Sequence, residues 1–366
     1  MRQGFPFFAS RTVTWYLART FVARSAAVLA GLVIILMALD LLGESGDILA
    51  APGNGQAAIW HYVTLRIPQL IQRFIPFAAL LGTLITLVRM NQNSEIISMK
   101  AAGISAHQIL APLMLSSVAI AGLNFWFDDR VVARATATLT AWQDAQYGPV
   151  SAQRNMVTNI WVRFGDDLIH VDEVTGRGKA AVLHRVTYYD REKDRLIAIA
   201  TATHGVPAGD RWKLIDVKRF DVASGDTRPL SAVLIAPGLD PSRFTLANVN
   251  GDGLSFRALA DTVAQLQAAG RPTSALRTQI WHKISGPLSI VLMPLLAGIA
   301  GFGLARSGRL FVRVVIGMGL GFLYFVADNF ALAMGNIGAY PPLLAAWAPF
   351  ALFLLIGEAV LIRTEE

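Results

Sequence analysis

Six long stretches of the chain are apolar enough to cross a membrane as helices, three before and three after a more polar central region. A helix needs about 20 mainly apolar residues to cross the roughly 30 Å hydrocarbon core of a bilayer. The pattern therefore predicts an α-helical integral membrane protein with six transmembrane helices (3+3), in domains 25–127 and 284–366. The stretches are Ser25–Gly43, Ile67–Val88, Ile109–Phe127, Ile284–Ala305, a run from about Val314 past Asp328, and Leu343–Ile362.

The central region, 128–283, changes from a helical to an alternating pattern. Gly, Asp and Pro clusters separate its apolar runs, as in antiparallel sheets. We expect an inserted all-β domain at about 156–250, built as a sandwich or jelly roll. A connecting helix should follow at about 255–270, with Ser255 as its N-cap and Gly270 at its end. The alternating runs are Ile160–Phe164, Leu168–Asp172, Val182–Tyr189, Leu196–Thr203 and Trp212–Phe220.

Composition supports a membrane protein with one soluble insert. Hydrophobic residues make up 54% of the chain and charged residues only 16%, against about 25% charged in soluble domains. Lys and Arg number 32 and Asp and Glu 25, and 37 of these charges lie between Asp128 and Lys283. Disordered, collagen-like and coiled-coil classes are therefore excluded. Cysteine is absent, which excludes disulfides and thiolate chemistry.

Basic residues in short loops predict the orientation of the spans. Lys and Arg favour the cytoplasmic side, so both termini should be cytoplasmic and the insert should lie on the opposite side. The segment 1–24 should contain a cytoplasmic interfacial helix, because Arg11–Arg24 mixes arginines with aromatic residues; a plain basic flank is the alternative. The basic residues of the cytoplasmic side are Arg2, Arg11, Arg19, Arg24, Arg89, Lys100, Arg306, Arg309, Arg313 and Arg363.

Sequence motifs for catalysis and for nucleotide or metal binding are missing from the chain. There is no G-x-x-x-x-G-K-[ST] phosphate loop, no H-E-x-x-H and no G-x-S-x-G. The six histidines are scattered along the sequence. We therefore expect a non-catalytic protein with no cofactor, no metal and no nucleic-acid partner.

A compact amphipathic helix is predicted at about 92–103, between the second and third spans. Ser94 suits the N-cap, Glu95 suits the positive end of the helix dipole, and Gly103 suits the C-cap. Its apolar face could dock into a groove on another protein; the alternative is a loop helix that lies on lipid. That face would consist of Ile96, Met99, Ala101 and Ala102.

This helix also carries a resemblance to a known family. Ser94–Ile104 resembles the coupling helix of the LptF/LptG permeases, the membrane subunits of the lipopolysaccharide export ABC transporter. The proline-containing run Ile75–Gly82 and the start of the fourth span, Trp281–Ser289, are similar to the same family. Gly321–Asp328 and Gly338–Pro342 look more like the LptG branch than the LptF branch.

The resemblance implies a fold, a function and a set of partners. Such permeases sit in the bacterial inner membrane with a periplasmic jelly-roll insert that continues the lipid path. They pair LptG with LptF, and a cytoplasmic LptB dimer that binds ATP and Mg docks on both coupling helices. A single-span partner, LptC, inserts beside LptG. Glu95 would be the acidic contact to the ATPase, and the cargo would be lipopolysaccharide or a related glycolipid.

One feature departs from the family pattern. Family members often have basic residues at the outer end of the first span, whereas this chain has Asp40, Glu44 and Asp47. These charges would repel a phosphate by a few tenths to about 1 kcal/mol each. The head group would then need other cations, and interfacial anchoring is the alternative role for them. The candidates are two pairs at helical spacing, Arg66 with Arg73 and Arg130 with Arg134.

Two further expectations remain open at the sequence level. Gly317 and Gly321 form a small-xxx-small pattern that would allow close contact with the partner permease, although such patterns also arise by chance. The alternative functions are a lipoprotein-release type permease and a periplasmic sensor. The former would carry its large insert after the first span, and the latter would need a cytoplasmic output module.

Overall fold

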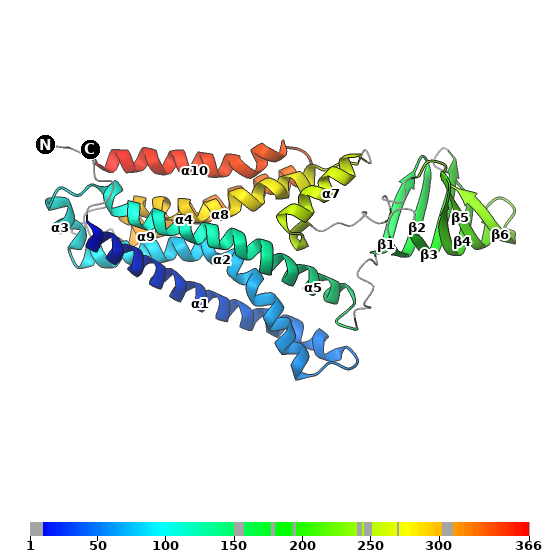
Figure 1. Ribbon diagram of the computed structural model, residues 1–366, viewed down its shortest axis with the longest axis horizontal. Helices are drawn as coiled ribbons and strands as arrows, with labels where there is room; N and C mark the ends of the chain where they lie inside the picture. The colour runs from blue at the N-terminus through cyan, green and yellow to red at the C-terminus, as the bar shows by residue number, and fades with distance from the viewer. Residues whose placement is uncertain are drawn as a thin grey trace. The chain divides into compact units, whose positions relative to one another are not determined.

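The computed structural model of the chain contains two compact units (Figure 1). The helical unit comprises residues 1–149, 251–263 and 273–366, and the β unit comprises residues 150–250 and 264–272. Arg2, Arg306 and Arg309, which contribute to the predicted orientation, lie outside the described residues. The described residues are 10–149, 157–176, 180–192, 195–239, 244, 251–268, 271–301 and 310–365.

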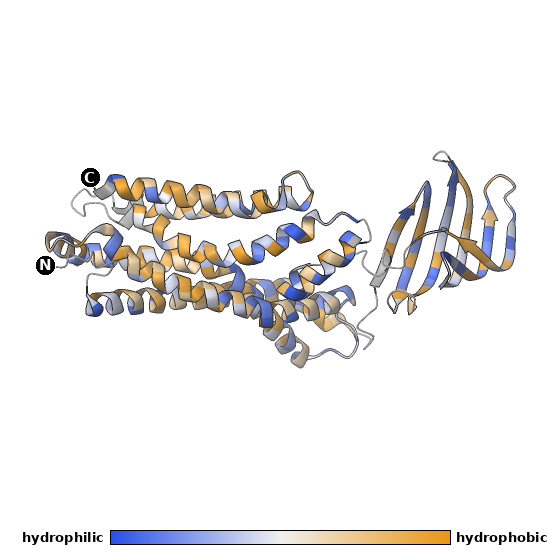
Figure 2. Ribbon diagram, turned by 45° about the horizontal axis from the view of Figure 1, so that its top comes forward, coloured by the Kyte–Doolittle hydropathy of each residue, from blue (hydrophilic) through white to orange (hydrophobic). Residues whose placement is uncertain are grey.

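Within the described residues, six helices of the helical unit are long and apolar enough to cross a membrane, which confirms the six predicted spans. The fourth of these helices packs against α2, α4, α9 and α10 and is the most buried. Figure 2 shows apolar residues along the length of these helices. Their bounds are α1 (Arg11–Ala50), α2 (Gln56–Gln92), α4 with its continuation (Ala106–Asp144), α8 (Ser274–Gly301), α9 (Leu310–Asn336) and α10 (Pro342–Glu365).

The first span begins earlier than predicted. α1 runs without a break from Arg11 to Ala50, and the Ser10 side chain caps it by accepting a hydrogen bond from the Val13 amide at 3.2 Å. The expected separate interfacial helix in segment 1–24 is therefore the first part of the first span. Close packing holds α1 to α2, because a Cβ on Gly82 would lie 2.1 Å from the Ser25 hydroxyl.

The third span continues beyond its predicted end. α4 (Ala106–Phe127) passes through a π-helical turn, η1 (Asp128–Val132), into α5 (Ala133–Asp144). Residues 128–149 consequently belong to the helical unit, and the insert does not begin at 128 as predicted. The sequence pattern ended the span at the first charge, whereas the helix buries Asp128 and continues.

The β unit confirms the predicted all-β insert. The five predicted runs fall within the first five of six strands, and only the sixth was missed. Pro229 lies in this last strand, where it weakens the strand signal and is tolerated because the strand is at an edge. The strands are β1 (Val157–Phe164), β2 (Asp167–Thr175), β3 (Val182–Glu192), β4 (Arg195–Ala208), β5 (Arg211–Asp221) and β6 (Thr227–Ile235).

The described strands form a meander. Their order in the sheet is the order in the chain, and every neighbouring pair is antiparallel. A jelly roll exchanges strands between two sheets, so this part of the prediction is corrected for the described strands. Polar and apolar residues alternate along them (Figure 2), and one face forms the core. Its buried residues include Ile169, Val171, Leu183, Trp212 and Leu214.

The predicted connecting helix is also present, as α7 (Phe256–Ala268). Ser255 serves as its N-cap, since its hydroxyl accepts a hydrogen bond from the Ala258 amide at 3.4 Å. A second acceptor comes from η1, because the Asp129 carboxylate accepts from the Phe256 amide at 2.5 Å. The first turn of α7 is thereby fixed to the end of the third span.

Candidate functional site

A cavity of about 660 Å³ lies in the helical unit among α2, α4, α8 and α9. This volume is in the range of pockets that hold small molecules. The turn η1, helix α5 and the short 3-10 helix η3 (Gly251–Gly253) complete its wall. We call the end of the helical unit that leads to and from residues 150–250 the insert end, and the opposite end the α3 end, after the short helix α3 (Glu95–Ala101).

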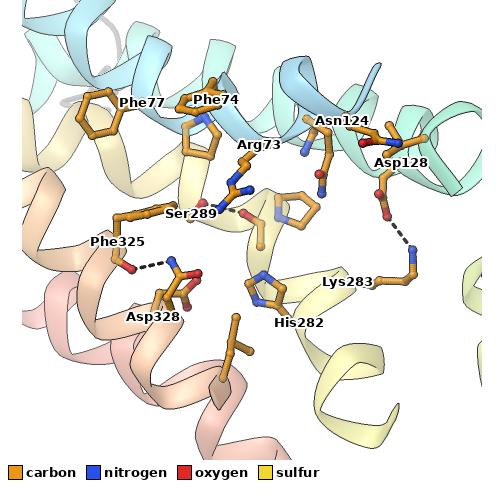
Figure 3. A pocket seen from close by; sticks show the side chains of 18 of the residues that line it. Arg73, Phe74, Phe77, Asn124, Asp128, His282, Lys283, Ser289, Phe325 and Asp328 are labelled. Atoms are coloured by element: carbon orange, nitrogen blue, oxygen red, sulfur yellow. Dashed lines mark hydrogen bonds and ion pairs between the residues drawn. The ribbon is translucent and has the colours of Figure 1, made fainter. Parts of the chain in front are cut away.

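The two ends of the cavity differ in chemistry. Polar side chains line it towards the insert end, and they include Gln69, Arg73, Asn124, Gln279, His282 and Asp328. Aromatic and apolar side chains line it towards the α3 end, and they include Phe74, Phe77, Met293, Phe322 and Phe325. Figure 3 shows Phe77 and Phe74 at one end and the Asp128–Lys283 pair at the other. The cavity therefore suits an amphiphile whose polar group lies towards the insert end.

Arg66 borders this cavity, but its charge is already used. Its guanidinium binds the Asp40 carboxylate of α1 through two hydrogen bonds of 3.0 and 2.9 Å, and donates a third to Gln69 at 2.8 Å. The Tyr62 hydroxyl donates to the same carboxylate at 2.6 Å. Two-pronged pairing of this kind fixes both partners. Arg66 therefore ties α2 to α1 in this structure, and its predicted role in holding a head group stays a prediction.

Glu44, a second acid of the first span, is also satisfied. It accepts a hydrogen bond from the hydroxyl of Tyr147, which follows α5. The pKa of Tyr147 is raised to about 12, mainly because the hydroxyl is buried and secondly because it donates this hydrogen bond. Asn54 donates to the Tyr147 and Ile48 carbonyls at 2.8 and 2.9 Å, which closes the cluster.

We call Asp40, Glu44, Tyr62, Arg66 and Tyr147 the paired corner. Packing around it is apolar, with Met37, Leu70 and Trp142 among the buried neighbours. Asp40, Glu44 and Asp47 do not line the cavity. The repulsion of a phosphate that the sequence suggested at this end of the first span is therefore not directed at the cavity.

Arg73 is the basic residue that the structure leaves available in the cavity. It lies seven residues after Arg66 on α2, is exposed, and points into the cavity (Figure 3). Among the described residues it has no ion-pair partner. Lys283, by contrast, donates to the Asp128 carboxylate at 2.8 Å, with side chains only 10% and 12% exposed. Arg73 can thus attract an anionic group without breaking an existing pair.

Arg130 and Arg134 do not reach this site. Both are exposed on η1 and α5 and neither lines the cavity, so this part of the prediction is corrected. The cavity face of this helix carries a different series at helical spacing: Asn124, Asp128, Val132 and Thr136. Spacing alone placed the two arginines on a common face, but it did not identify which face meets the other helices.

The sequence also failed to assign several polar residues to the site. Asp328 could be read as a charge near a span end that reaches water, whereas the structure places it in the cavity wall beside His282. Asn124 and Gln279 carried no signal. The general rule that ionisable residues within spans mark functional sites would have identified Asp328, and also the Asp128–Lys283 pair.

The second candidate site is α3, a short helix at the other end of the unit. Its C-terminus forms a Schellman motif, in which the Ile104 and Gly103 amides donate to the Met99 and Lys100 carbonyls, both at 3.0 Å. Gly103 adopts a positive φ of 82°, which confirms its predicted role. Ser94 occupies the N-cap position with a φ of 58°, but its side chain makes no capping hydrogen bond.

The faces of α3 differ from the prediction. Ile96 is only 4% exposed and Met99 packs beside it against the core of the bundle, so these two residues do not form an external docking surface. The exposed face instead carries Ile97, which is 45% exposed, and Ala101. Glu95 accepts a hydrogen bond from the Tyr16 hydroxyl of α1 at 3.2 Å. It therefore connects α3 to the first span within the chain.

Gly317 and Gly321 are buried within the chain. A Cβ on Gly321 would lie 2.2 Å from the Leu80 side chain of α2, so this glycine allows α9 to approach α2. The prediction that the glycine pair contacts a partner permease is therefore corrected. The exposed positions of α9 are occupied by large apolar residues, among them Val315, Phe322 and Phe330.

Comparison with known proteins agrees with these features. Residues 15–363 match the family of lipopolysaccharide export system permeases LptF/LptG. LptG of Escherichia coli K12 is 26% identical over 308 residues, which cover 82% of this chain and 84% of that protein. LptG of Haemophilus influenzae is 26% identical over 324 residues, covering 86% and 89% respectively. The chain, with six apolar helices and a β insert between the third and fourth, belongs to the LptF/LptG family of multi-pass inner-membrane permeases.

Proposed function

We propose that this permease subunit takes lipopolysaccharide or a related glycolipid from the outer leaflet of the inner membrane and passes it towards the β insert. In this proposal both termini are cytoplasmic, the α3 end faces the cytoplasm and the insert end faces the periplasm. ATP and Mg are bound by a partner ATPase, and this chain performs no catalysis. The energy for moving the lipid reaches the chain through α3.

The observation that carries this proposal is the chemical gradient along the cavity. An outer-leaflet lipid has its polar group towards the periplasm and its acyl chains towards the membrane centre. Arg73 and the neighbouring polar side chains lie towards the insert end, and the phenylalanines of α2 and α9 lie towards the α3 end. Burial of acyl chains against these rings would contribute about 0.8 kcal/mol per buried methylene group.

Charge reversal at Arg73 tests this role. Arg73→Glu removes a charge-assisted hydrogen bond, worth about 1.5–3 kcal/mol. We expect the lipopolysaccharide concentration that half-maximally stimulates ATPase activity in proteoliposomes to rise about 10- to 100-fold. Arg134→Glu is the matched control, because Arg134 is an exposed arginine outside the cavity. Equal effects of the two substitutions would contradict the proposal.

The ATPase contact is proposed for the exposed face of α3. Ile97 is the large apolar side chain on this face, and helices dock into grooves on partner proteins through such apolar side chains. Glu95 stays part of the proposal as the acidic contact, with Ser94 at the N-cap position and Gly103 closing the C-terminus of the helix. Because Glu95 also accepts from Tyr16, a change at Ile97 separates docking from contacts within the chain more cleanly.

Substitution of Ile97 therefore provides the second test. We expect Ile97→Asp to reduce co-purification of the ATPase about tenfold or more, without loss of folded protein, since Ile97 makes no core contact. Leu196→Asp in the β unit, another exposed apolar position, serves as the control. Full retention of the ATPase by Ile97→Asp would show that docking occurs elsewhere.

The remaining partners follow from the family and from exposed surface. We propose LptF as the paralogous permease, a dimer of LptB as the ATPase, and LptC as a single-span partner. The large apolar residues exposed on α1 and α9 outside the cavity, such as Ile34, Leu42 and Phe330, would face lipid or these partner helices. The family match over most of the chain favours this function over a lipoprotein-release permease or a sensor.

A further inference from the structure

The polar end of the cavity contains hydrogen-bonding groups that the described part of the chain does not satisfy. The Asn124 carbonyl oxygen is buried and has no partner, and the whole residue is only 4% exposed. The Gln279 carbonyl oxygen is likewise buried without a partner, and it packs against Gly251 of η3, where a Cβ would lie 1.7 Å from it. Both residues line the cavity, from α4 and from α8. A buried unsatisfied acceptor costs about 1–3 kcal/mol, so native structures rarely retain one without a reason.

Asp328 adds a third acceptor group from α9. Its carboxylate lines the same cavity, and no described residue donates a hydrogen bond to it. In Figure 3 its side chain lies on the opposite wall from Arg73, and His282 of α8 lies near it. Three helices thus each contribute an acceptor to one polar compartment.

The cations near this compartment do not compensate for these acceptors. Lys283 is paired with Asp128, and Arg66 is paired with Asp40. Arg73 is the available cation, and one guanidinium suits a single anionic group. The excess of acceptors therefore calls for a ligand that is rich in hydrogen-bond donors beyond its anionic group. A second phosphate at this level would be disfavoured by the Asp328 carboxylate.

We propose that Asn124, Gln279 and Asp328 form a saccharide subsite that accepts hydrogen bonds from hydroxyl groups of the head group of the transported lipid. This inference rests on the proposed function and adds a second determinant to Arg73. Arg73 binds the anionic group, and the three acceptors distinguish a sugar-bearing lipid from an ordinary phospholipid. The amides of Asn124 and Gln279 can also rotate about their terminal torsions to present their donor groups.

Two shape-preserving substitutions test the subsite. Asn124→Leu and Gln279→Met remove the amides and keep similar volumes, and their combination removes two acceptors at once. Because apolar groups then replace unsatisfied polar groups, the thermal midpoint of the purified complex should stay equal or rise. Affinity for lipopolysaccharide in nanodiscs should fall about 5- to 50-fold. A purely structural role would predict the opposite change in stability, with no change in selectivity.

Two reference lipids make the outcomes distinguishable. Phosphatidic acid has an anionic group without a sugar, so its affinity should not change in the double variant and should fall in Arg73→Glu. Phosphatidylethanolamine offers an ammonium group instead of hydroxyls. If the double variant loses affinity for phosphatidylethanolamine by the same factor as for lipopolysaccharide, the subsite reads an ammonium group and the saccharide assignment is overturned.

Failure of the subsite and failure of the proposed function give different results. If the wild-type complex binds lipopolysaccharide and the double variant binds it equally well, the subsite is wrong while the proposed function stands. If the wild-type complex binds no more lipopolysaccharide than phosphatidic acid, and Arg73→Glu changes neither, the proposed function itself fails. Asp328→Asn should reproduce the selective loss for lipopolysaccharide on a smaller scale, because the amide retains one acceptor oxygen.

Discussion

The paired corner and the cavity wall use the same kinds of residue in opposite ways. In the corner, Arg66, Asp40 and Glu44 are all bound to one another or to tyrosine hydroxyls. In the wall, Arg73, Asn124 and Asp328 have no ion-pair or hydrogen-bond partner that satisfies these groups among the described residues. The paired corner satisfies its own polar groups and holds α1 and α2 to Tyr147, which follows α5. The other retains its binding capacity for something outside the chain.

This difference shows that a sequence tells where the charged residues are, but not which of them are free to bind a ligand. Arg66 and Arg73 lie seven residues apart on one helix, so the sequence treats them as equivalent. The structure separates them because Asp40 of α1 faces only the first. A residue is free to bind a ligand when the neighbouring helices fail to satisfy it, and that is a property of the packed bundle.

The largest effect is expected from breaking the pair that lies within the cavity wall itself. Lys283→Met leaves the nearly buried Asp128 carboxylate without its cation, which should cost about 3–5 kcal/mol of stability. The double variant Lys283→Met with Asp128→Leu should recover most of that loss. Thermal unfolding of the purified protein measures both. If the single variant were as stable as the wild type, Asp128 would not depend on Lys283, and the pair would have to be grouped with the unpaired residues of the cavity wall.

A smaller effect compares the two arginines of α2 directly. Arg66→Met should lower the free energy of unfolding by about 1–3 kcal/mol, because Asp40 loses a two-pronged partner that is partly buried. Arg73→Met should change it by no more than about 0.5 kcal/mol. Chemical unfolding in detergent checks the difference. If the two variants lost the same stability, the division between the corner and the wall would not hold.

The smallest effect concerns pH. The pKa of Tyr147 is raised from its ordinary value of 10.0 to about 12, so the folded state favours the neutral hydroxyl. Its contribution to stability should be complete below pH 10 and disappear as the pH rises from 10 to 12. Tyr147→Phe should remove one component near pH 12 from the tyrosinate absorbance titration. An unchanged titration would place Tyr147 outside the hydrogen-bonded corner.

Local patterns predicted the elements well. Apolar runs of span length gave the six helices, and alternation gave the first five strands, because each pattern is contained in one short window. The predicted ends of the helices and the number of strands were less accurate. Asp128 appeared to end the third span, whereas Lys283, distant in the sequence, neutralises it and lets the helix continue. Pro229 concealed β6, because its position at a sheet edge is a property of the whole sheet.

The site was harder to predict because it depends on which faces meet. Ile96 and Ile97 are adjacent and equally apolar, and only the packed bundle shows that the first is buried and the second exposed. Gly321 was expected to contact another subunit, but Leu80 of the same chain occupies that face. Asn124 and Gln279 carried no signal, since an amide in an apolar run becomes informative only when its missing partner is visible.

The short helix α3 is held to the bundle along its buried face and at its C-terminus. Ile96 is embedded in the same core as α2, α4 and α8, and the backbone of Gly103 and Ile104 closes directly onto the last turn. Any displacement of the exposed side of α3 must therefore move the ends of the long helices or expose Ile96 to water. A force applied to α3 is therefore expected to act on α2, α4 and α8, three of the helices that enclose the cavity.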